Sequence, residues 1–110
     1  RHPGTVVVLG DLNPGGIIIA AGDIFIWGRL RGITHAGANG NRQARILALK
    51  MEPTQLRIAD MVARAPKSAP QNYTPEIAYI ATNGICLGQA IDFAKTHSFS
   101  EEMRCWTDSP

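Results

Sequence analysis

Charge of either sign is scarce in this chain, and so are aromatic residues, cysteine and long apolar runs. Charged residues make up 18% of 110 residues and leave a net charge of +2, too little for a dedicated nucleic-acid binder. No apolar run approaches the roughly 18–20 residues of a membrane span. Two cysteines, Cys86 and Cys105, do not make a disulfide framework, so we expect them to be reduced and intracellular. With 6% aromatic residues, the core is expected to be aliphatic.

The residue types that carry catalysis or bind metals are equally sparse. The histidines at positions 2, 35 and 97 are far apart, and neither cysteine lies at zinc-finger spacing from another ligand. The chain has no serine in a nucleophile-elbow setting and no nucleotide-binding glycine loop. We therefore expect no metal site, no cofactor and no enzyme activity. The chain begins with Arg1, which indicates a fragment of a longer protein.

Glycine recurs every sixth residue in the first forty positions. It stands at Gly4, Gly10, Gly16, Gly22, Gly28 and Gly40, with Thr34 in the remaining slot. Apolar residues follow two positions after the first six slots, at Val6, Leu12, Ile18, Ile24, Leu30 and Ala36. This spacing lacks the intervals of three and four that an amphipathic helix requires. Alternation of period 2, broken at every sixth residue, is typical of short strands joined by sharp bends.

Such strands, stacked in coils, predict an all-β fold, a short parallel β-helix of triangular cross-section. Three hexads make one coil of about 18 residues. The alternative is an ordinary antiparallel meander with glycine turns. The register slips after Gly40, where residues 39–43 predict a polar turn or small bulge between coils.

Residues 18 positions apart are expected to stack on the same outer face. The first face then presents Val7, Leu9, Phe25 and Trp27. An apolar patch centred on a Phe–Trp pair is typical of an interface core, so we predict two-fold self-association through it. The alternative is that the C-terminal segment folds back over this face. The second face presents Asn13, Gly15, Arg31 and Ile33.

The chain divides into four segments by composition and pattern. Residues 1–63 are expected to form the β-helix coils, and residues 64–75 a proline-rich linker. Residues 76–92 hold a last strand pair joined near Asn83-Gly84, which is expected to cap the β-helix. Residues 93–110 are polar and mixed, which predicts a mobile tail or a short helix.

One enzymatic alternative uses the same repeat. Hexapeptide-repeat acyltransferases are trimeric β-helices with a histidine as general base, and His35 is the candidate within the hexads. Two features disfavour this alternative. The regular hexads cover only about two coils, and glycine lies two positions before the aliphatic residue, whereas those enzymes place a small residue immediately after it.

Several stretches resemble the C-terminal domain of MinC, the bacterial division-site inhibitor. The likeness runs from about Thr5 to Leu87, and its most specific part is LRGITHAGANGN at residues 30–41. The other stretches are GDLNPGG at 10–16, AGDIFIWG at 21–28, EPTQLRIA at 52–59 and PEIAYI at 75–80. The resemblance implies that the triangular β-helix is right-handed, because the hexads alone suit either hand.

The resemblance also implies a function. In this family the C-terminal domain forms a homodimer and binds MinD, a membrane-associated ATPase, in its ATP-bound state. The N-terminal domain antagonises FtsZ assembly, and the C-terminal domain contacts FtsZ as well. The implied protein is a cytoplasmic, non-enzymatic inhibitor of septum formation without cofactors or nucleic acid. It reaches the inner face of the membrane only through MinD.

The two outer faces fit these implied roles. The first face, with Val7, Leu9, Phe25 and Trp27, is the expected dimer interface, and the second supplies the expected MinD-binding set, Asn13, Gly15, Arg31 and the neighbouring Gly32. Of these, Gly15, Arg31 and Gly32 stand at positions that the family pattern shares. In the family an Arg-Ser-Gly-Gln motif that contributes to MinD contact precedes the position of residue 1. The segment from Asp92 to Pro110 matches no pattern of the family.

Overall fold

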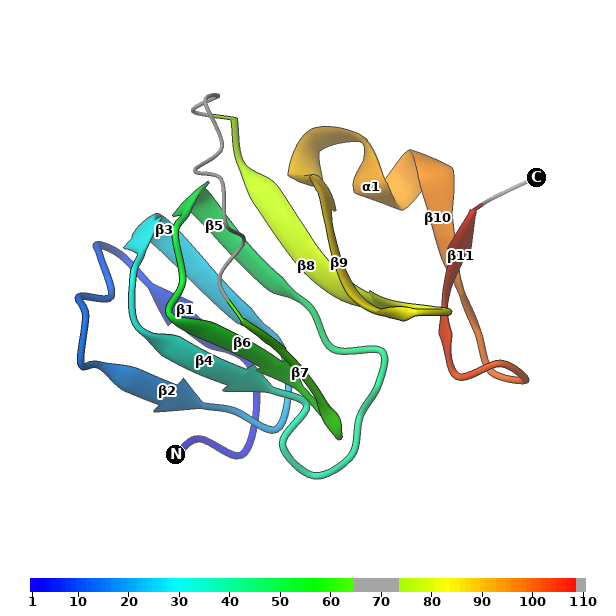
Figure 1. Ribbon diagram of the computed structural model, residues 1–110, viewed down its shortest axis with the longest axis horizontal. Helices are drawn as coiled ribbons and strands as arrows, with labels where there is room; N and C mark the ends of the chain where they lie inside the picture. The colour runs from blue at the N-terminus through cyan, green and yellow to red at the C-terminus, as the bar shows by residue number, and fades with distance from the viewer. Residues whose placement is uncertain (65–73, 109–110) are drawn as a thin grey trace.

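The computed structural model describes residues 1–64 and 74–108. Short strands dominate this part of the chain, and one short helix lies near its C-terminal end (Figure 1). The elements are β1 (Val6–Val8), β2 (Ile17–Ile19), β3 (Ile24–Leu30), β4 (Ile33–Ala36), β5 (Ile46–Met51), β6 (Gln55–Ile58), β7 (Met61–Arg64), β8 (Glu76–Ala81), β9 (Gly84–Gln89), α1 (Ala90–Thr96), β10 (His97–Ser100) and β11 (Cys105–Asp108).

The strands of the described residues form three sheets. The larger has the order β1-β3-β5-β8-β9. In it β1, β3 and β5 run parallel, β8 runs antiparallel to β5, and β9 runs antiparallel to β8. The second has the order β2-β4-β6-β7, with β7 antiparallel to its neighbour. The third is the antiparallel hairpin of β10 and β11, set to one side of the others (Figure 1).

The expected single right-handed parallel β-helix of triangular cross-section is wrong for this chain. The finding that overturns it is the division into separate sheets of mixed strand direction. An offset of 18 residues relates β1 to β3, where Val6 pairs with Ile24. It falls to 16 residues between β2 and β4, and rises to 22 between β3 and β5, where Ile24 pairs with Ile46.

The parallel order ends where β7, β8 and β9 pair with antiparallel neighbours. After β6, Ala59 adopts a φ of 52°, and β7 returns antiparallel along β6. In the larger sheet β8 pairs with β5 in antiparallel register, with Ile46 opposite Ala78, and β9 returns along β8. Antiparallel strands close with a short connection, whereas parallel strands need a longer crossover.

The main core lies between the two larger sheets. Alternate residues of each strand point inward, as the period of 2 requires. The fully buried side chains include Ile24, Ile26, Leu30, Ile46, Met51, Ile58 and Ile80. They are joined by the small residues Ala20, Ala36 and Ala48, which leave room for the larger aliphatic groups. Burial of an aliphatic side chain stabilises the fold by about 1.5–3 kcal/mol.

Polar residues of the hexads satisfy backbone groups at the edges of the sheets. The Thr5 hydroxyl accepts the amide N–H of Asp23 at 3.1 Å, and the Asp11 carboxylate accepts that of Arg29 at 2.7 Å. The Asp23 carboxylate in turn accepts the amide N–H of Arg45 at 2.7 Å. These residues therefore tie each layer of strands to the next one along the chain.

Residues 90–108, here named the C-terminal module, comprise α1, β10 and β11. Phe93 and Trp106 of the module are buried, at 3% and 9% exposed, against Ile77 and Tyr79 of β8. The sequence predicted a short helix or a mobile tail here but not the hairpin.

The expected strand pair before the module is present as β8 and β9. The linker expected at 64–75 lies outside the described residues except for residues 64, 74 and 75. No helix in the described part of the chain has the length and hydrophobicity that crossing a bilayer requires.

Candidate functional site

An apolar surface covers the outer side of β1, β3 and β5. Parallel pairing places Val7 beside Phe25 and Phe25 beside Leu47, so one apolar row crosses three strands. Val7 is 59% exposed, Leu9 is 84% exposed and Trp27 is 62% exposed, while Phe25 is half-buried. We name this surface the apolar face. Its residues are Val7, Leu9, Phe25, Trp27, Leu47 and Leu49.

The apolar face arises from the strand sequence itself. In β3 the inward positions hold Ile24 and Ile26, and the outward positions hold Phe25 and Trp27. A strand with one solvated side normally places polar residues there. Apolar residues on both sides therefore indicate that the outer side is covered by another surface.

Sequence reasoning missed Leu47 and Leu49 because the register slips after residue 40. The signal that could have found them is the run Ile46-Leu47-Ala48-Leu49, in which both alternating sets are apolar. Ile46 and Ala48 are fully buried, which leaves the two leucines on the outer side.

The predicted polar set comes together at one corner of the structure. The Arg31 guanidinium donates to the side-chain oxygen of Asn13 at 3.0 Å, and the Arg31 amide donates to the Leu12 carbonyl at 2.8 Å. Gly15 is exposed with a φ of 90°, and a Cβ there would meet no atom within 4 Å. We name Asn13, Gly15 and Arg31 the polar corner.

Gly32 differs from the polar corner because it is buried. A Cβ at this position would collide with the carbonyl oxygen of Gly16 and would lie 2.8 Å from that of Asn13. Glycine at 32 therefore lets two segments of this chain pack closely, which is a reason independent of any partner.

The described residues hold no cluster of three or more metal-ligating side chains. His35, the residue considered as a general base, is half-buried, and its Nε2 lies 3.0 Å from the carbonyl oxygen of Ala59. Arg57 is its partner in the neighbouring strand. Since a carbonyl oxygen can only accept, this contact engages the Nε2–H of the imidazole.

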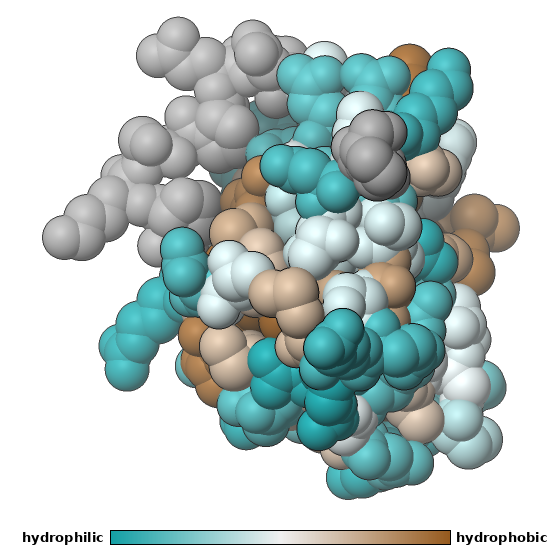
Figure 2. Space-filling view, turned by 90° about the vertical axis from the view of Figure 1, so that its right-hand side faces the viewer, coloured by the Kyte–Doolittle hydropathy of each residue, from teal (hydrophilic) through white to brown (hydrophobic). Residues whose placement is uncertain are grey.

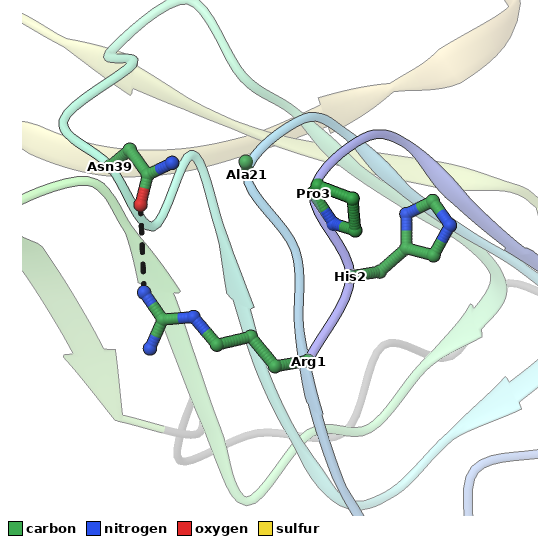
Figure 3. Close-up of a pocket in the computed structure, with 5 residues that line it drawn as sticks. All are labelled: Arg1, His2, Pro3, Ala21 and Asn39. Carbon is green, nitrogen blue, oxygen red and sulfur yellow. Dashed lines mark hydrogen bonds between the residues drawn. The ribbon is translucent and has the colours of Figure 1, made fainter.

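A small hollow near the first residues is lined by Arg1, His2, Pro3, Ala21 and Asn39 (Figure 3). The Arg1 guanidinium reaches across it to the side-chain oxygen of Asn39 at 3.5 Å. The His2 ring points away from this pair, and its Nδ1 accepts the amide N–H of Gly4 at 3.0 Å. The polar groups of the hollow are thus engaged with one another or with the backbone rather than converging on a ligand.

Two acidic side chains of β8 have pKa values above their ordinary ones. Burial raises the pKa of the Glu76 carboxyl above its ordinary value. Burial also raises the pKa of the Tyr79 phenol, with smaller contributions from Cys86 and Asp108. Both groups are therefore stabilised in their neutral forms.

Replacing Glu76 with glutamine is expected to stabilise the protein slightly at neutral pH. The raised pKa means that the folded state holds this proton more tightly than the unfolded state. The favourable contribution is therefore complete below the ordinary carboxyl pKa and is lost as pH rises through the folded value. Thermal unfolding should show Glu76→Gln with a higher Tm than the parent at pH 7, and no difference at about pH 4. The exposed Glu101→Gln should change Tm at neither pH, and an equal gain there would contradict the assignment.

Comparison with known proteins assigns the chain to a family. The sequence pattern of the family described as "Septum formation inhibitor MinC, C-terminal domain" matches residues 1–90. The chain belongs to the MinC C-terminal domain family. This match confirms the resemblance seen in the sequence and displaces the acyltransferase alternative.

Individual MinC relatives support the assignment. The chain is 61% identical over 95 residues to a probable septum site-determining protein MinC of Nostoc, which covers 86% of this chain and 26% of the relative. It is 55% identical over 94 residues to that of Gloeobacter violaceus, covering 86% of this chain and 34% of the relative. The chain thus spans about a quarter to a third of these two MinC relatives.

A solved structure gives the same assignment. The fold is similar to a chain of the MinC:MinD cell division protein complex of Aquifex aeolicus, with a TM-score of 0.70 and 34% identity. The likeness covers 81% of this chain and 78% of that chain. The MinC family match includes the apolar face and the polar corner, and it ends at residue 90, where the C-terminal module begins.

Proposed function

We propose that this chain is the dimerisation and MinD-binding part of a MinC protein. The parent protein acts without catalysis: it helps to place the division septum by preventing FtsZ ring formation at wrong sites. The observation that carries the proposal is the family match over residues 1–90, which contains both candidate surfaces. The similar Aquifex protein comes from a complex with MinD, which supports the same partner for this chain.

The homodimer forms through the apolar face, with Val7, Leu9, Phe25 and Trp27 at its centre. Removing the exposed parts of Leu9 and Trp27 from water favours association, and a large aromatic residue is a typical anchor of such an interface. A two-fold arrangement brings the same surface of both copies together.

MinD in its ATP-bound state binds at Asn13, Gly15 and Arg31, and the buried Gly32 supports this site from within by letting the chain pack closely behind Arg31. Asn13 holds the Arg31 side chain at 3.0 Å, so the guanidinium loses less conformational freedom when it meets a partner. Its planar fork suits a carboxylate of the ATPase. The absence of a side chain at Gly15 lets the partner approach the backbone closely.

Binding to MinD through the polar corner would determine where the protein acts in the cell. The protein is cytoplasmic and is recruited to the inner face of the membrane by MinD. Because a dimer carries two polar corners, two MinD molecules can hold it at once, and the second contact benefits from a high effective concentration. The dimer then presents the FtsZ-inhibiting part of the parent protein at the membrane.

Co-sedimentation with the cognate MinD and anionic lipid vesicles tests the proposal. The chain is expected to pellet with MinD in the presence of ATP and to stay in the supernatant with ADP. Arg31→Glu should weaken this binding at least tenfold, which corresponds to about 1.4 kcal/mol, because it places a carboxylate where the partner meets a guanidinium.

The matched control is Arg64→Glu, which makes the same charge change at an exposed position of the edge strand β7. Arg64→Glu should bind MinD as the parent chain does. Equal binding by Arg31→Glu and the parent would remove Arg31 from the site, and the same pelleting with ATP and ADP would contradict the ATP-dependent partner.

A further inference from the structure

The C-terminal module covers only one half of the outer side of the larger sheet. Tyr79 of β8 lies beneath Phe93, with ring centroids 4.8 Å apart, and Phe93 contacts Trp106 at 4.9 Å. On the same side of the sheet, pairing continues the apolar row from Ile77 through Leu47 to Phe25. The sequence-based alternative, in which the C-terminal segment covers Val7 and Trp27, is thus not what the structure shows, since both remain exposed.

Hydrogen bonds fix the C-terminal module to the body of the protein. The Trp106 indole N–H donates to the Gln43 carbonyl at 3.2 Å, and the Arg42 guanidinium donates to the Arg104 carbonyl at 2.9 Å. The Arg45 guanidinium lies 5.3 Å from the Trp106 ring centre, a favourable cation–π distance. The module therefore holds α1 at a defined place beside the apolar face.

Helix α1 extends the apolar face through a shallow groove. The groove is lined by Trp27, Leu47 and Leu49 of the sheet, by Thr74 and Pro75, and by Ala90 and Ile91 of the helix. Ile91 is 81% exposed on the far wall of this groove. Beyond the groove, the outer surface of the C-terminal module is mostly hydrophilic, with hydrophobic residues at its margins (Figure 2).

We propose that a second copy of this chain occupies the groove and that Ile91 of each copy contacts its partner in the dimer. The inference rests on the proposed dimerisation through the apolar face, which it extends to Ile91, the first residue beyond the family match. The groove and the exposed Trp27 share one surface, so each copy offers both an apolar hollow and an apolar projection. An isologous contact requires this combination, because the same surface must be complementary to itself.

The area that a stable dimer must bury also favours including the groove and Ile91 in the interface. A stable complex buries about 800 Å² on each partner, whereas the apolar face exposes three large side chains to a substantial degree, Val7, Leu9 and Trp27. Adding the groove and Ile91 widens the contact toward that size. The hydrophilic outer surface of the C-terminal module then forms the polar rim that surrounds the core of a typical interface.

Ile91→Glu in this chain tests the inference by sedimentation equilibrium. We expect the dimer dissociation constant to rise at least tenfold, because the dimer would bury an unpaired carboxylate. Ile91→Ala should weaken the dimer in the same direction and by less. Ile91 is exposed in the single chain and lies in the first turn of α1, where a carboxylate is well tolerated, so circular dichroism should show the parent fold.

The matched control is Met103→Glu, at a residue 56% exposed between β10 and β11 and away from the groove. It should leave the dissociation constant unchanged. A dimer weakened by Trp27→Glu but not by Ile91→Glu would overturn this inference and leave the proposed dimer intact. An entirely monomeric parent chain would overturn both, and an apolar peptide that binds the groove without competing with dimerisation would assign it to another partner.

Discussion

Trp27→Glu is expected to convert the dimer into a monomer. Trp27 is 62% exposed and lies in β3, between the short edge strand β1 and the two leucines of β5. In the proposed dimer the indole of Trp27 would be removed from water, and glutamate at this position would bury a charge without a partner. A central tryptophan of an interface is worth about 2 kcal/mol or more, so the dissociation constant should rise roughly thirtyfold or more.

Light scattering over a range of concentrations measures this change as a halved molar mass. Trp27→Phe is the matched conservative variant and should stay mostly dimeric, because it keeps an aromatic side chain at the same position. Circular dichroism of Trp27→Glu should match the parent, since the residue lies outside both buried clusters. An unchanged molar mass for Trp27→Glu would remove the apolar face from the dimer interface.

Gly28→Ala is expected to destabilise the fold by about 1–3 kcal/mol, the usual cost of forcing an extra methyl group into a packed site. A Cβ at position 28 would collide with the Gly10 carbonyl oxygen and would lie 2.5 Å from the Asp11 carboxylate. Backbone atoms cannot rotate out of the way as a side-chain end can. The Asp11 carboxylate also accepts the Arg29 amide N–H at 2.7 Å, so displacing it breaks a contact between layers.

Gly4→Ala is the matched control, because Gly4 occupies another slot of the same six-residue series. A Cβ there would meet only the His2 ring, at 3.5 Å, which is ordinary contact. Urea unfolding should therefore place the midpoint of Gly28→Ala well below that of the parent and that of Gly4→Ala close to it. Equal midpoints for the two variants would show that the close approach at residue 28 is not needed for stability.

The six-residue series predicted local structure well and long-range structure less well. Alternation identified the inward residues Ile24 and Ile26 and the outward residues Phe25 and Trp27, because side-chain direction in a strand follows directly from residue parity. The slip after Gly40 was also visible in the sequence. The structure shows it as a change of offset from 18 residues at β1 and β3 to 22 at β3 and β5.

The expectation of one continuous parallel β-helix failed at the turns. Whether β7 returns along β6 depends on Ala59 adopting a positive φ, which an alanine does not signal in a sequence. Likewise, the pairing of β8 with β5 joins residues about thirty positions apart. Local patterns carry no information on which distant edge a strand will meet, because that is decided by competition among free edges.

In the candidate site, too, some contacts follow from the sequence and others appear only in the folded structure. Asn13 and Arg31 are brought together by an 18-residue spacing that is readable in the sequence. The groove beside Trp27 was not foreseen, since it needs Ile91 of α1, which lies just beyond the family match.

By itself, the sequence determined the family, the β-rich class, the inward and outward residues of the first strands, and the apolar character of the face that holds Trp27. Each of these follows from residue type and local spacing. Only the tertiary structure decided the division into sheets of mixed direction, the reach of the C-terminal module, and the place of Ile91 beside the apolar face. Those features depend on contacts between segments far apart in the sequence, such as the hydrogen bond from the Trp106 indole N–H to the Gln43 carbonyl. Such contacts form, and stabilise the protein, only after the chain has closed the long loops between the segments.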